Sequence, residues 1–374
     1  FGQAVIAAGI VVGGLGVMTL ASILGFAVSR HLGLTQRMLA TQEAGTGAMG
    51  QISTLLKAVI ATSLSMQALL AAMFLPRFLA MGFDPVRAIW DAVFMAISVF
   101  NNAGFVILPD GLAPHVTDWW MLIPIILGTT VGAIGFPVIM DVAKNLRTPR
   151  RWRLHTKLTL STYLILAFVG ALAMALTEWH NPTTLGAIDT PSKILNAMLA
   201  GVNSRSSGLS ALDVGAMHSQ THFVQDILMM IGGGSASTAG GVKVTTFAVL
   251  VLAVIAEARG DRDIETFGRR IPTSTIRLSV AVSLLGLALV AISVVLLMSM
   301  TDYTLDIILF ETVSAFATVG LSTGITPILP VGAKYVLIFL MFAGRTGSMT
   351  VAAALALRQR SRVIRMPEEQ PIIG

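Results

Sequence analysis

The chain alternates long apolar segments with short polar connections, and seven of the apolar segments are long enough to cross a lipid bilayer. A membrane-spanning helix needs about 20 predominantly apolar residues. The predicted spans cover residues 4–28, 52–75, 119–143, 157–177, 222–256, 275–300 and 331–357. The pattern therefore predicts an all-α integral membrane protein.

Three further apolar segments are too short to span, and each is followed by a polar loop with a central glycine. The short segments cover residues 85–99, 191–202 and 304–316, and the loops cover 100–105, 203–209 and 317–324. Non-helical backbone at membrane depth is tolerated only where it is buried in protein or lines a water-filled path. We expect helices that enter the membrane and return, each ending in a loop beside such a path.

The loop glycines Gly104, Gly208 and Gly320 mark three copies of one unit: outer helix, pore helix, loop and glycine-broken inner helix. The chain is interpreted as one membrane domain, residues 1–374. Its predicted units cover 51–150, 151–265 and 266–374, the last with a C-terminal tail. Repeats of this kind predict a pseudo-fourfold arrangement similar to that of potassium channels.

The first apolar helix carries the same glycine mark, at Gly13, Gly14 and Gly16, but no loop precedes it. Residues 1–50 are interpreted as the inner helix of a first unit followed by a cytoplasmic loop. Spacing in the other units puts the absent loop glycine roughly 11–15 residues before Phe1. We therefore expect an N-terminal truncation. A natural chain of three and a half units is the alternative, but it would expose loop backbone to lipid.

Charge placement predicts the orientation. Only 12% of the residues are charged, against about 25% in soluble proteins. Of the 25 basic residues, 18 lie in connections opposite the glycine loops: Arg30, Arg37, Lys57, Lys144, Arg147, Arg150, Arg151, Arg153, Lys157, Arg259, Arg262, Arg269, Arg270, Arg277, Arg358, Arg360, Arg362 and Arg365. Basic connections stay in the cytoplasm, so the loops and the C-terminus are predicted to lie on opposite sides, with the loops outside. The net charge of +6 then reflects topology, not a nucleic-acid surface.

The loops have the chemistry of an ion filter. Rings of backbone carbonyls replace the hydration shell of a cation, glycine permits the required backbone angles, and helix C-termini favour positive charge. The predicted filter residues are Asn101, Asn102, Ala103, Gly104, Ser204, Arg205, Ser206, Ser207, Gly208, Ala317, Thr318, Val319 and Gly320. A single such loop would be interpreted as an ordinary turn, but three in register favour a filter. The chain has no cysteine, so thiolate metal sites are excluded, and no transition-metal site is expected.

A second glycine-rich segment lies inside the span 222–256. Residues 232–241 contain five glycines, and helix propensity collapses over such a run. This helix is therefore predicted to break into two halves joined by a loop. A glycine-rich helix-packing surface is the alternative, but packing needs a glycine at every fourth residue rather than clusters.

Together these motifs resemble the membrane subunit of the Trk/Ktr/HKT superfamily of potassium uptake proteins, and the tail Pro367–Gly374 looks Ktr-like. The resemblance implies potassium uptake across the bacterial plasma membrane through one central pore, with no cofactor and with sodium as a candidate activator. It also implies a homodimer, contact with membrane lipids, and a cytosolic ring of nucleotide-binding (RCK-type) subunits. The implied gate residues are Gly232, Gly233, Gly234, Ser235, Ser237, Thr238, Gly240, Gly241, Lys243 and Arg345.

Several polar side chains have two interpretations. Arg345 matches the family's pore arginine, a barrier beneath the filter, with a structural ion pair or snorkelling as the alternative. Lys243, an implied gate residue near the cytoplasmic end, has snorkelling as its alternative. Arg205 either holds its loop from behind or is solvated at the mouth. Glu311 either accepts hydrogen bonds from loop amides or faces the outer mouth.

Two other functional classes are less favoured. His218, His222 and Asp226 could hold a metal, but a solvated helix N-terminus is the default interpretation. An alternating-access cation symporter would also use broken helices, but it usually has inverted repeats, whereas these repeats share one orientation. The His-Glu-x-x-His motif is absent, and no enzymatic activity is expected.

Overall fold

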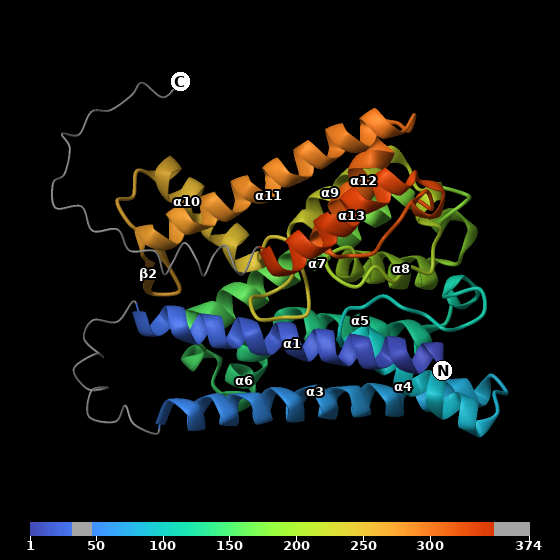
Figure 1. Ribbon diagram of the computed structural model, residues 1–374, viewed down its shortest axis with the longest axis horizontal. Coiled ribbons are helices and arrows are strands. Elements are labelled where there is room, and N and C mark those ends of the chain that lie inside the picture. Colours follow the sequence, from blue (N-terminus) through green and yellow to red (C-terminus); the bar gives the residue numbers. More distant parts are fainter. Residues whose placement is uncertain (32–46, 348–374) are drawn as a thin grey trace.

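The computed structural model describes residues 1–31 and 47–347, which are mostly helical. The long helices are α1 (Gly2–His31), α3 (Gly47–Ala80), α7 (Leu154–Glu178) and α11 (Thr273–Met300). Each contains a segment long and apolar enough to cross a membrane, which confirms four of the predicted spans. Helices α1, α3 and α11 run along the long axis of the molecule (Figure 1).

Two predicted spans are broken, as their glycines indicated. Helices α5 (Trp119–Ile134) and α6 (Phe136–Lys144) meet at Gly135 with a bend of 97°. Helices α9 (Ser219–Met230) and α10 (Val244–Arg259) are separated by residues 231–243. The last span begins as α13 (Val331–Phe342) and continues as a π-helical turn, η7 (Ala343–Gly347). Its predicted remainder lies outside the described residues.

The three short apolar segments are helices, as predicted: α4 (Pro85–Phe100), α8 (Thr190–Asn203) and α12 (Leu305–Ala317). Aspartate side chains cap two of them, since Asp84 accepts from the Val86 amide at 3.2 Å and Asp189 from the Ser192 amide at 3.4 Å. Such caps satisfy free amides in the first turn. All three helices lie in the right-hand half of Figure 1.

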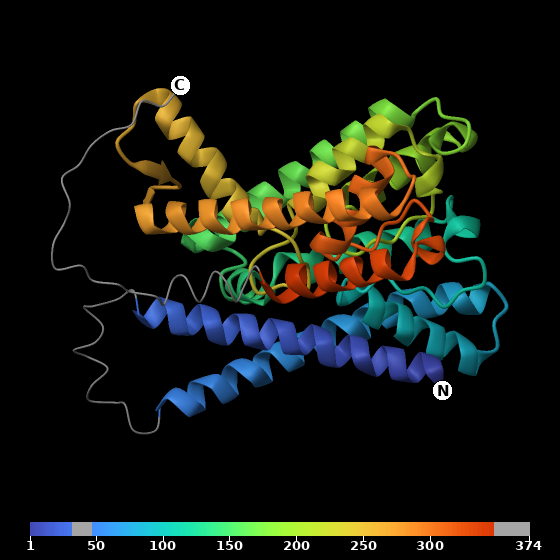
Figure 2. The same ribbon diagram turned by 45° about the horizontal axis from the view of Figure 1, so that its top comes forward.

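Each short helix packs against the long helix that precedes it, in the pairs α3–α4, α7–α8 and α11–α12. Phe78, Met95 and Ile125 belong to one apolar core between α3, α4 and α5. A second core joins α9, α11, α12 and α13. Large apolar side chains are exposed along the outer faces of the long helices, such as Leu176 and Val295, as expected for contact with lipid. Figure 2 shows that the long helices cross one another at angles, with α11 above α1 and α3 in this view.

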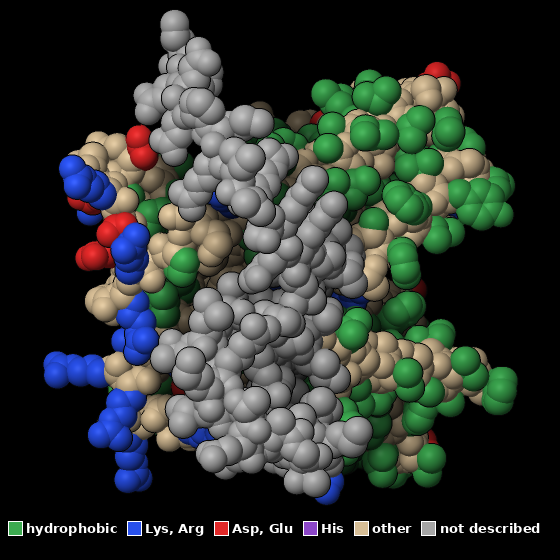
Figure 3. Space-filling model, turned by 60° about the vertical axis from the view of Figure 1, so that its left-hand side comes forward, with side chains coloured by type: hydrophobic (Ala, Val, Ile, Leu, Met, Phe, Trp, Pro, Cys, Tyr) green, Lys and Arg blue, Asp and Glu red, His purple; other side chains and the backbone are tan. Residues whose placement is uncertain are grey.

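A small β-hairpin, β1 (Ile264–Thr266) and β2 (Arg269–Ile271), follows α10 and was not predicted. It lies at the left of Figure 1, away from α4 and α8. Exposed basic side chains from this hairpin, α10 and the α6–α7 connection are Lys144, Arg147, Arg150, Arg151, Arg153, Arg259, Arg262, Arg269 and Arg270. Figure 3 shows Lys and Arg side chains gathered along one edge of this end.

Short 3₁₀ turns complete the connections: η2 (Ala113–His115), η3 (Pro149–Arg151), η4 (Leu185–Ala187), η5 (Val214–Ala216) and η6 (Thr326–Ile328). Several predictions fall outside the described residues. These concern the connection 32–46 with Arg37, the basic residues Arg358, Arg360, Arg362 and Arg365, and the tail Pro367–Gly374.

Candidate ion filter and gate

The three predicted filter glycines share one backbone conformation. Gly104, Gly208 and Gly320 have φ of +75°, +64° and +94°, a region that residues with a side chain adopt only with strain. The loops also touch one another. A Cβ added to Gly104 would overlap Ser207 O, and one added to Gly208 would overlap Val319 O and the backbone of Gly320. Consecutive loops are therefore neighbours in space, with backbone against backbone.

Side chains near the ends of the short helices α8 and α12 hold two of the loops. Ser314 Oγ donates to Leu321 O at 2.6 Å, and Asn203 Nδ2 donates to Leu209 O at 2.7 Å. In both loops the acceptor is the carbonyl that follows the filter glycine. Ser314 Oγ also accepts from the Gly320 amide at 3.2 Å. The loop conformation is thus fixed by contacts within the same unit.

Glu311 holds the outer part of the third loop. Its Oε1 accepts from the Thr323 amide at 2.8 Å and from Ser322 Oγ at 2.7 Å, and its Oε2 accepts from Thr326 Oγ1 at 2.6 Å. Thr323 Oγ1 donates to Oε1 as well, at 2.9 Å. Of the two interpretations of Glu311, bonding to a loop amide is the one observed.

Arg205 is fully buried, which corrects the alternative of a solvated residue at the mouth. Its guanidinium carbon lies 3.6 Å from the ring centroid of Tyr163, on α7. Within the described part of the chain its three side-chain nitrogens have no hydrogen-bond partner. The cation–π contact therefore attaches the 203–209 loop to the outer helix of its unit.

The matching glycines of the inner helices allow close contact with the pore helices. A Cβ at Gly132 would overlap Phe100 O, and a Cβ at Gly344 would overlap Phe316 O. Both phenylalanines lie four residues before a filter glycine. Two units therefore make the same backbone contact, which supplies a physical reason for glycine at these positions.

The loop 231–243 is held by the bent inner helix α5–α6. The Gly234 amide donates to Ala133 O at 2.7 Å, and the Phe136 amide donates to Ala236 O at 3.2 Å. A Cβ at Gly135 would come within 2.5 Å of Ser235 O. The 97° bend at Gly135 thus lies directly against the glycine-rich loop.

Both predicted cationic gate residues reach this loop. The Arg345 guanidinium donates to Thr238 O, and Lys243 Nζ donates to Ala239 O at 2.6 Å. Lys243 is buried, which excludes the alternative that it snorkels to the membrane surface. Arg345 contacts the loop carbonyl and forms no ion pair among the described residues. The loop accordingly concentrates two positive side chains around a segment rich in carbonyls.

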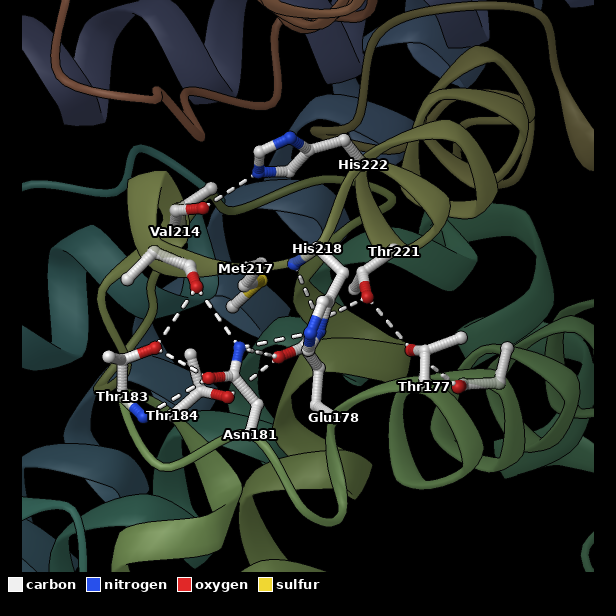
Figure 4. Close-up of polar contacts among 12 residues, drawn as sticks. Thr177, Glu178, Asn181, Thr183, Thr184, Val214, Met217, His218, Thr221 and His222 are labelled. Atoms are coloured by element: carbon white, nitrogen blue, oxygen red, sulfur yellow. Dashed lines mark hydrogen bonds and ion pairs between the residues drawn. The ribbon is translucent and has the colours of Figure 1, made fainter.

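A buried carboxylate that the sequence did not single out ties the end of α7 to the start of α9 (Figure 4). Glu178 is fully buried, and it accepts from Asn181 Nδ2 at 2.6 Å, Thr184 Oγ1 at 2.7 Å and the His218 amide at 2.9 Å. The Thr221 hydroxyl donates to it as well. The His218 ring Nδ1 lies 3.2 Å from Glu178 Oε1. Glu178 therefore orders the corner after the 203–209 loop.

The candidate metal residues do not converge. His222 Nε2 lies 2.8 Å from Val214 O, its ring packs on Phe310, and no group of three potential ligands lies together among residues 1–31 and 47–347. His222 and Asp226 are each only 5% exposed. The expectation of a solvated helix N-terminus is thus wrong for these two residues.

Comparison with known proteins agrees with this architecture. A family model described as "TrkH: Cation transport protein" matches residues 1–363. The chain belongs to this TrkH family. Among curated TrkH-like relatives, Ktr system potassium uptake protein B of Bacillus subtilis is 37% identical, covering 100% of this chain and 83% of the relative. The protein of the same name from Vibrio alginolyticus is 33% identical over 97% of this chain and 80% of the relative.

Other comparisons extend the TrkH family assignment. Potassium/sodium uptake protein NtpJ of Enterococcus hirae is 30% identical, over 100% of this chain and 83% of the relative. The crystal structure of the potassium transporter TrkH from Vibrio parahaemolyticus matches with a TM-score of 0.66 and 17% identity, covering 92% of this chain and 69% of that one. The structural match confirms the predicted all-α membrane fold, and the family match confirms the resemblance to Trk/Ktr membrane subunits.

Proposed function

We propose that this chain is the ion-conducting membrane subunit of a Ktr/Trk-type potassium uptake system. The main supporting observation is that three loops, each with a glycine of positive φ, lie side by side with their backbones in contact. Carbonyl groups in this setting can replace the water around a dehydrated potassium ion without adding fixed charge. The names of relatives in the same family, which include potassium uptake proteins and one potassium/sodium uptake protein, support this ion class.

The proposed filter is formed by the backbone around Gly104, Gly208 and Gly320, and a fourth loop completes the ring. Among residues 1–31 and 47–347, an added Cβ at Gly320 would meet no atom within 4 Å, whereas one at Gly104 or Gly208 would overlap a neighbouring loop. This difference supports a site for another loop beside Gly320. Potassium is the proposed transported ion, and sodium is a candidate activator.

The loop 231–243 is the proposed gate. Arg345 and Lys243 place positive charge around it, and like charge at low dielectric opposes the passage of a cation. Opening would move the loop away from Ala133. It would also separate the carbonyl of Thr238 from the guanidinium of Arg345. The flux then depends on how firmly these contacts hold the loop.

The basic end of the molecule is proposed to face the cytoplasm of a bacterial cell, with the filter loops outside. A homodimer and a cytosolic nucleotide-binding ring are the proposed partners. The chain's likeness to proteins named for a Ktr system supports a separate regulatory component. The hairpin β1–β2 and its exposed arginines lie at this end.

Ion uptake by the full-length protein tests the proposal. It is expressed in bacterial cells that lack their own potassium uptake systems, and Rb⁺ and Na⁺ uptake are measured with and without the membrane potential. We expect potential-driven Rb⁺ uptake that external K⁺ competes away. Absence of uptake by protein correctly inserted in the membrane contradicts the function. Saturable flux at carrier rates, without single-channel steps, would favour a symporter instead.

A further inference from the structure

One buried asparagine connects the proposed filter directly to the proposed gate. Asn102 Nδ2 donates to Thr238 Oγ1, in the loop 231–243, at 2.6 Å. Asn102 Oδ1 accepts from Ser206 Oγ, in the next filter loop, at 3.1 Å. All three side chains are at most 4% exposed. A single side-chain amide thus joins two filter loops and the glycine-rich loop, across sequence separations of 104 and 136 residues.

The local backbone explains why an asparagine can occupy this position. Asn102 has φ of +52°, in the left-handed region where asparagine is enriched among non-glycine residues. The adjacent inner helix leaves little room, since a Cβ at Gly132 would lie 2.8 Å from Asn102 Nδ2. The amide is therefore held in one orientation, with both of its polar atoms hydrogen-bonded.

Thr238 is contacted by a filter loop, by an inner helix and by Arg345. Its hydroxyl accepts from Asn102 and donates to Gly132 O at 3.1 Å, on the inner helix. Its backbone carbonyl accepts from the Arg345 guanidinium. A movement of the loop that breaks the Arg345 contact would carry Thr238 away from Asn102 as well. The buried Asn102 amide would then lose its acceptor, which is unfavourable unless the filter loop rearranges.

We propose that the Asn102–Thr238 hydrogen bond couples the gate to the filter, so that the position of the loop 231–243 changes ion preference in the filter. This inference rests on the proposed pore and deepens it. Coupling between two sites is reciprocal. Potassium in the filter must therefore shift the balance between the loop positions by the same factor by which the loop position shifts potassium binding.

A double-mutant cycle on the full-length protein tests this coupling. Thr238→Val keeps the side-chain shape but removes the hydroxyl, and Thr238→Ser keeps the hydroxyl and serves as the matched control. Asn102→Gly removes the amide while allowing the positive φ. The readout is the ratio of Rb⁺ to Na⁺ uptake. For each purified protein, the ratio of K⁺ to Na⁺ concentrations that give half-maximal thermal stabilisation supplies a second readout that needs no flux.

We expect Thr238→Val to change the ion ratio roughly threefold to tenfold, the equivalent of one hydrogen bond. Thr238→Ser is expected to retain the parent ratio. In the Asn102→Gly background, Thr238→Val should have a clearly smaller effect on the ratio, because the bond to Asn102 is already absent and only the bond to Gly132 O is lost. An equal effect of Thr238→Val in both backgrounds overturns the proposal, as does a change in total flux with an unaltered ratio. Failure of the parent protein to bind or take up K⁺ would instead count against the proposed function.

Discussion

The proposed filter loops and the loop 231–243 all turn at glycines inside the membrane domain, but the contacts that hold them differ in how far apart their partners lie in the sequence. Ser314 and Asn203 hold filter loops through acceptors six or seven residues away. The loop 231–243 has local contacts as well, such as Lys243 with Ala239, but it is also held by Ala133 and Arg345, each about a hundred residues away in sequence. The first kind of contact forms whenever the unit folds, whereas the second depends on how the units are placed relative to one another.

This difference suits the proposed filter loops to a fixed conformation and the loop 231–243 to a conformation that depends on how the helices are placed. A filter must keep its carbonyl geometry while ions pass, and local contacts within one unit keep that geometry during relative movement of the units. A gate must have two positions of similar free energy. Contacts from distant helices can be made or lost together when those helices shift, so the loop 231–243 is suited to switching.

The largest expected effect comes from crowding the contact between filter loops. Gly208→Ser adds a Cβ that overlaps Val319 O and the backbone of Gly320, in addition to the strain of its positive φ. We expect Rb⁺ uptake to fall on the order of tenfold or more. In Gly320→Ser the added Cβ meets no atom of the described residues within 4 Å, so backbone strain of about 1–2 kcal/mol is the main effect.

For Gly320→Ser we accordingly expect uptake to persist, with the preference for potassium over sodium reduced roughly threefold to tenfold. Parallel Rb⁺ and Na⁺ uptake assays, normalised to protein in the membrane, measure both variants. Equal behaviour of the two serine variants would show that contact between loops does not matter.

Deleting Gly233–Ala239 is the next largest change. It removes the amide contact to Ala133 and the Thr238 carbonyl that Arg345 binds. Because the proposed barrier is gone, we expect Rb⁺ uptake to rise several-fold in cells that lack the regulatory partner. Glu265→Gln, on the exposed hairpin, serves as the control and should leave uptake unchanged. A folded deletion variant with parental flux refutes the gate assignment.

Two buried glutamates make the comparison more specific. Both accept several hydrogen bonds, but Glu311 holds a proposed filter loop and Glu178 holds the corner between α7 and α9. Glu311→Gln and Glu178→Gln each weaken several hydrogen bonds to a carboxylate, at a cost of about 1.5–3 kcal/mol. Both should lower the melting temperature of the purified protein by a few degrees. Only Glu311→Gln should also reduce potassium preference, since Glu178 binds the corner between α7 and α9. A change in potassium preference in Glu178→Gln but not in Glu311→Gln would contradict the proposed role of Glu311.

The smallest expected effect concerns the contact behind the second filter loop. Tyr163→Leu removes the aromatic face beneath Arg205, a loss of about 0.5–2 kcal/mol. Tyr163→Phe retains the ring and is the matched control. We expect a small drop in melting temperature and in potassium preference for the leucine variant only. Matching values for the two variants would mean that the stacked ring does not stabilise the loop.

Much of the fold could be predicted because its signals are local. The lengths of apolar segments identified α4, α8 and α12 as helices too short to span, and clustered glycines marked the break between α9 and α10. The caps Asp84 and Asp189 are a further local signal, since each stands just before a proline-containing first turn. The hairpin 264–271 was missed because its strands have only three residues each.

The parts of the candidate site that were missed depend on tertiary placement. For Arg205 the sequence left open whether the side chain holds its loop or is solvated, and the deciding contact comes from Tyr163, 42 positions earlier in the chain. Lys243 follows a glycine-rich loop that folds back over its side chain. Asn102 is an ordinary filter-loop residue until Thr238 is brought beside it. No sequence spacing encodes these contacts.

The central claim, that backbone carbonyls of the glycine loops bind the transported ion, is tested most directly by locating that ion. Crystals of the full-length protein grown in Rb⁺ would reveal it by anomalous scattering. We predict a Rb⁺ peak among the carbonyls that precede Gly104, Gly208 and Gly320. Adding K⁺ should displace the Rb⁺ and remove this peak. Ordered loops with no peak there, or a Rb⁺ site bound by side chains elsewhere in the membrane domain, would contradict it.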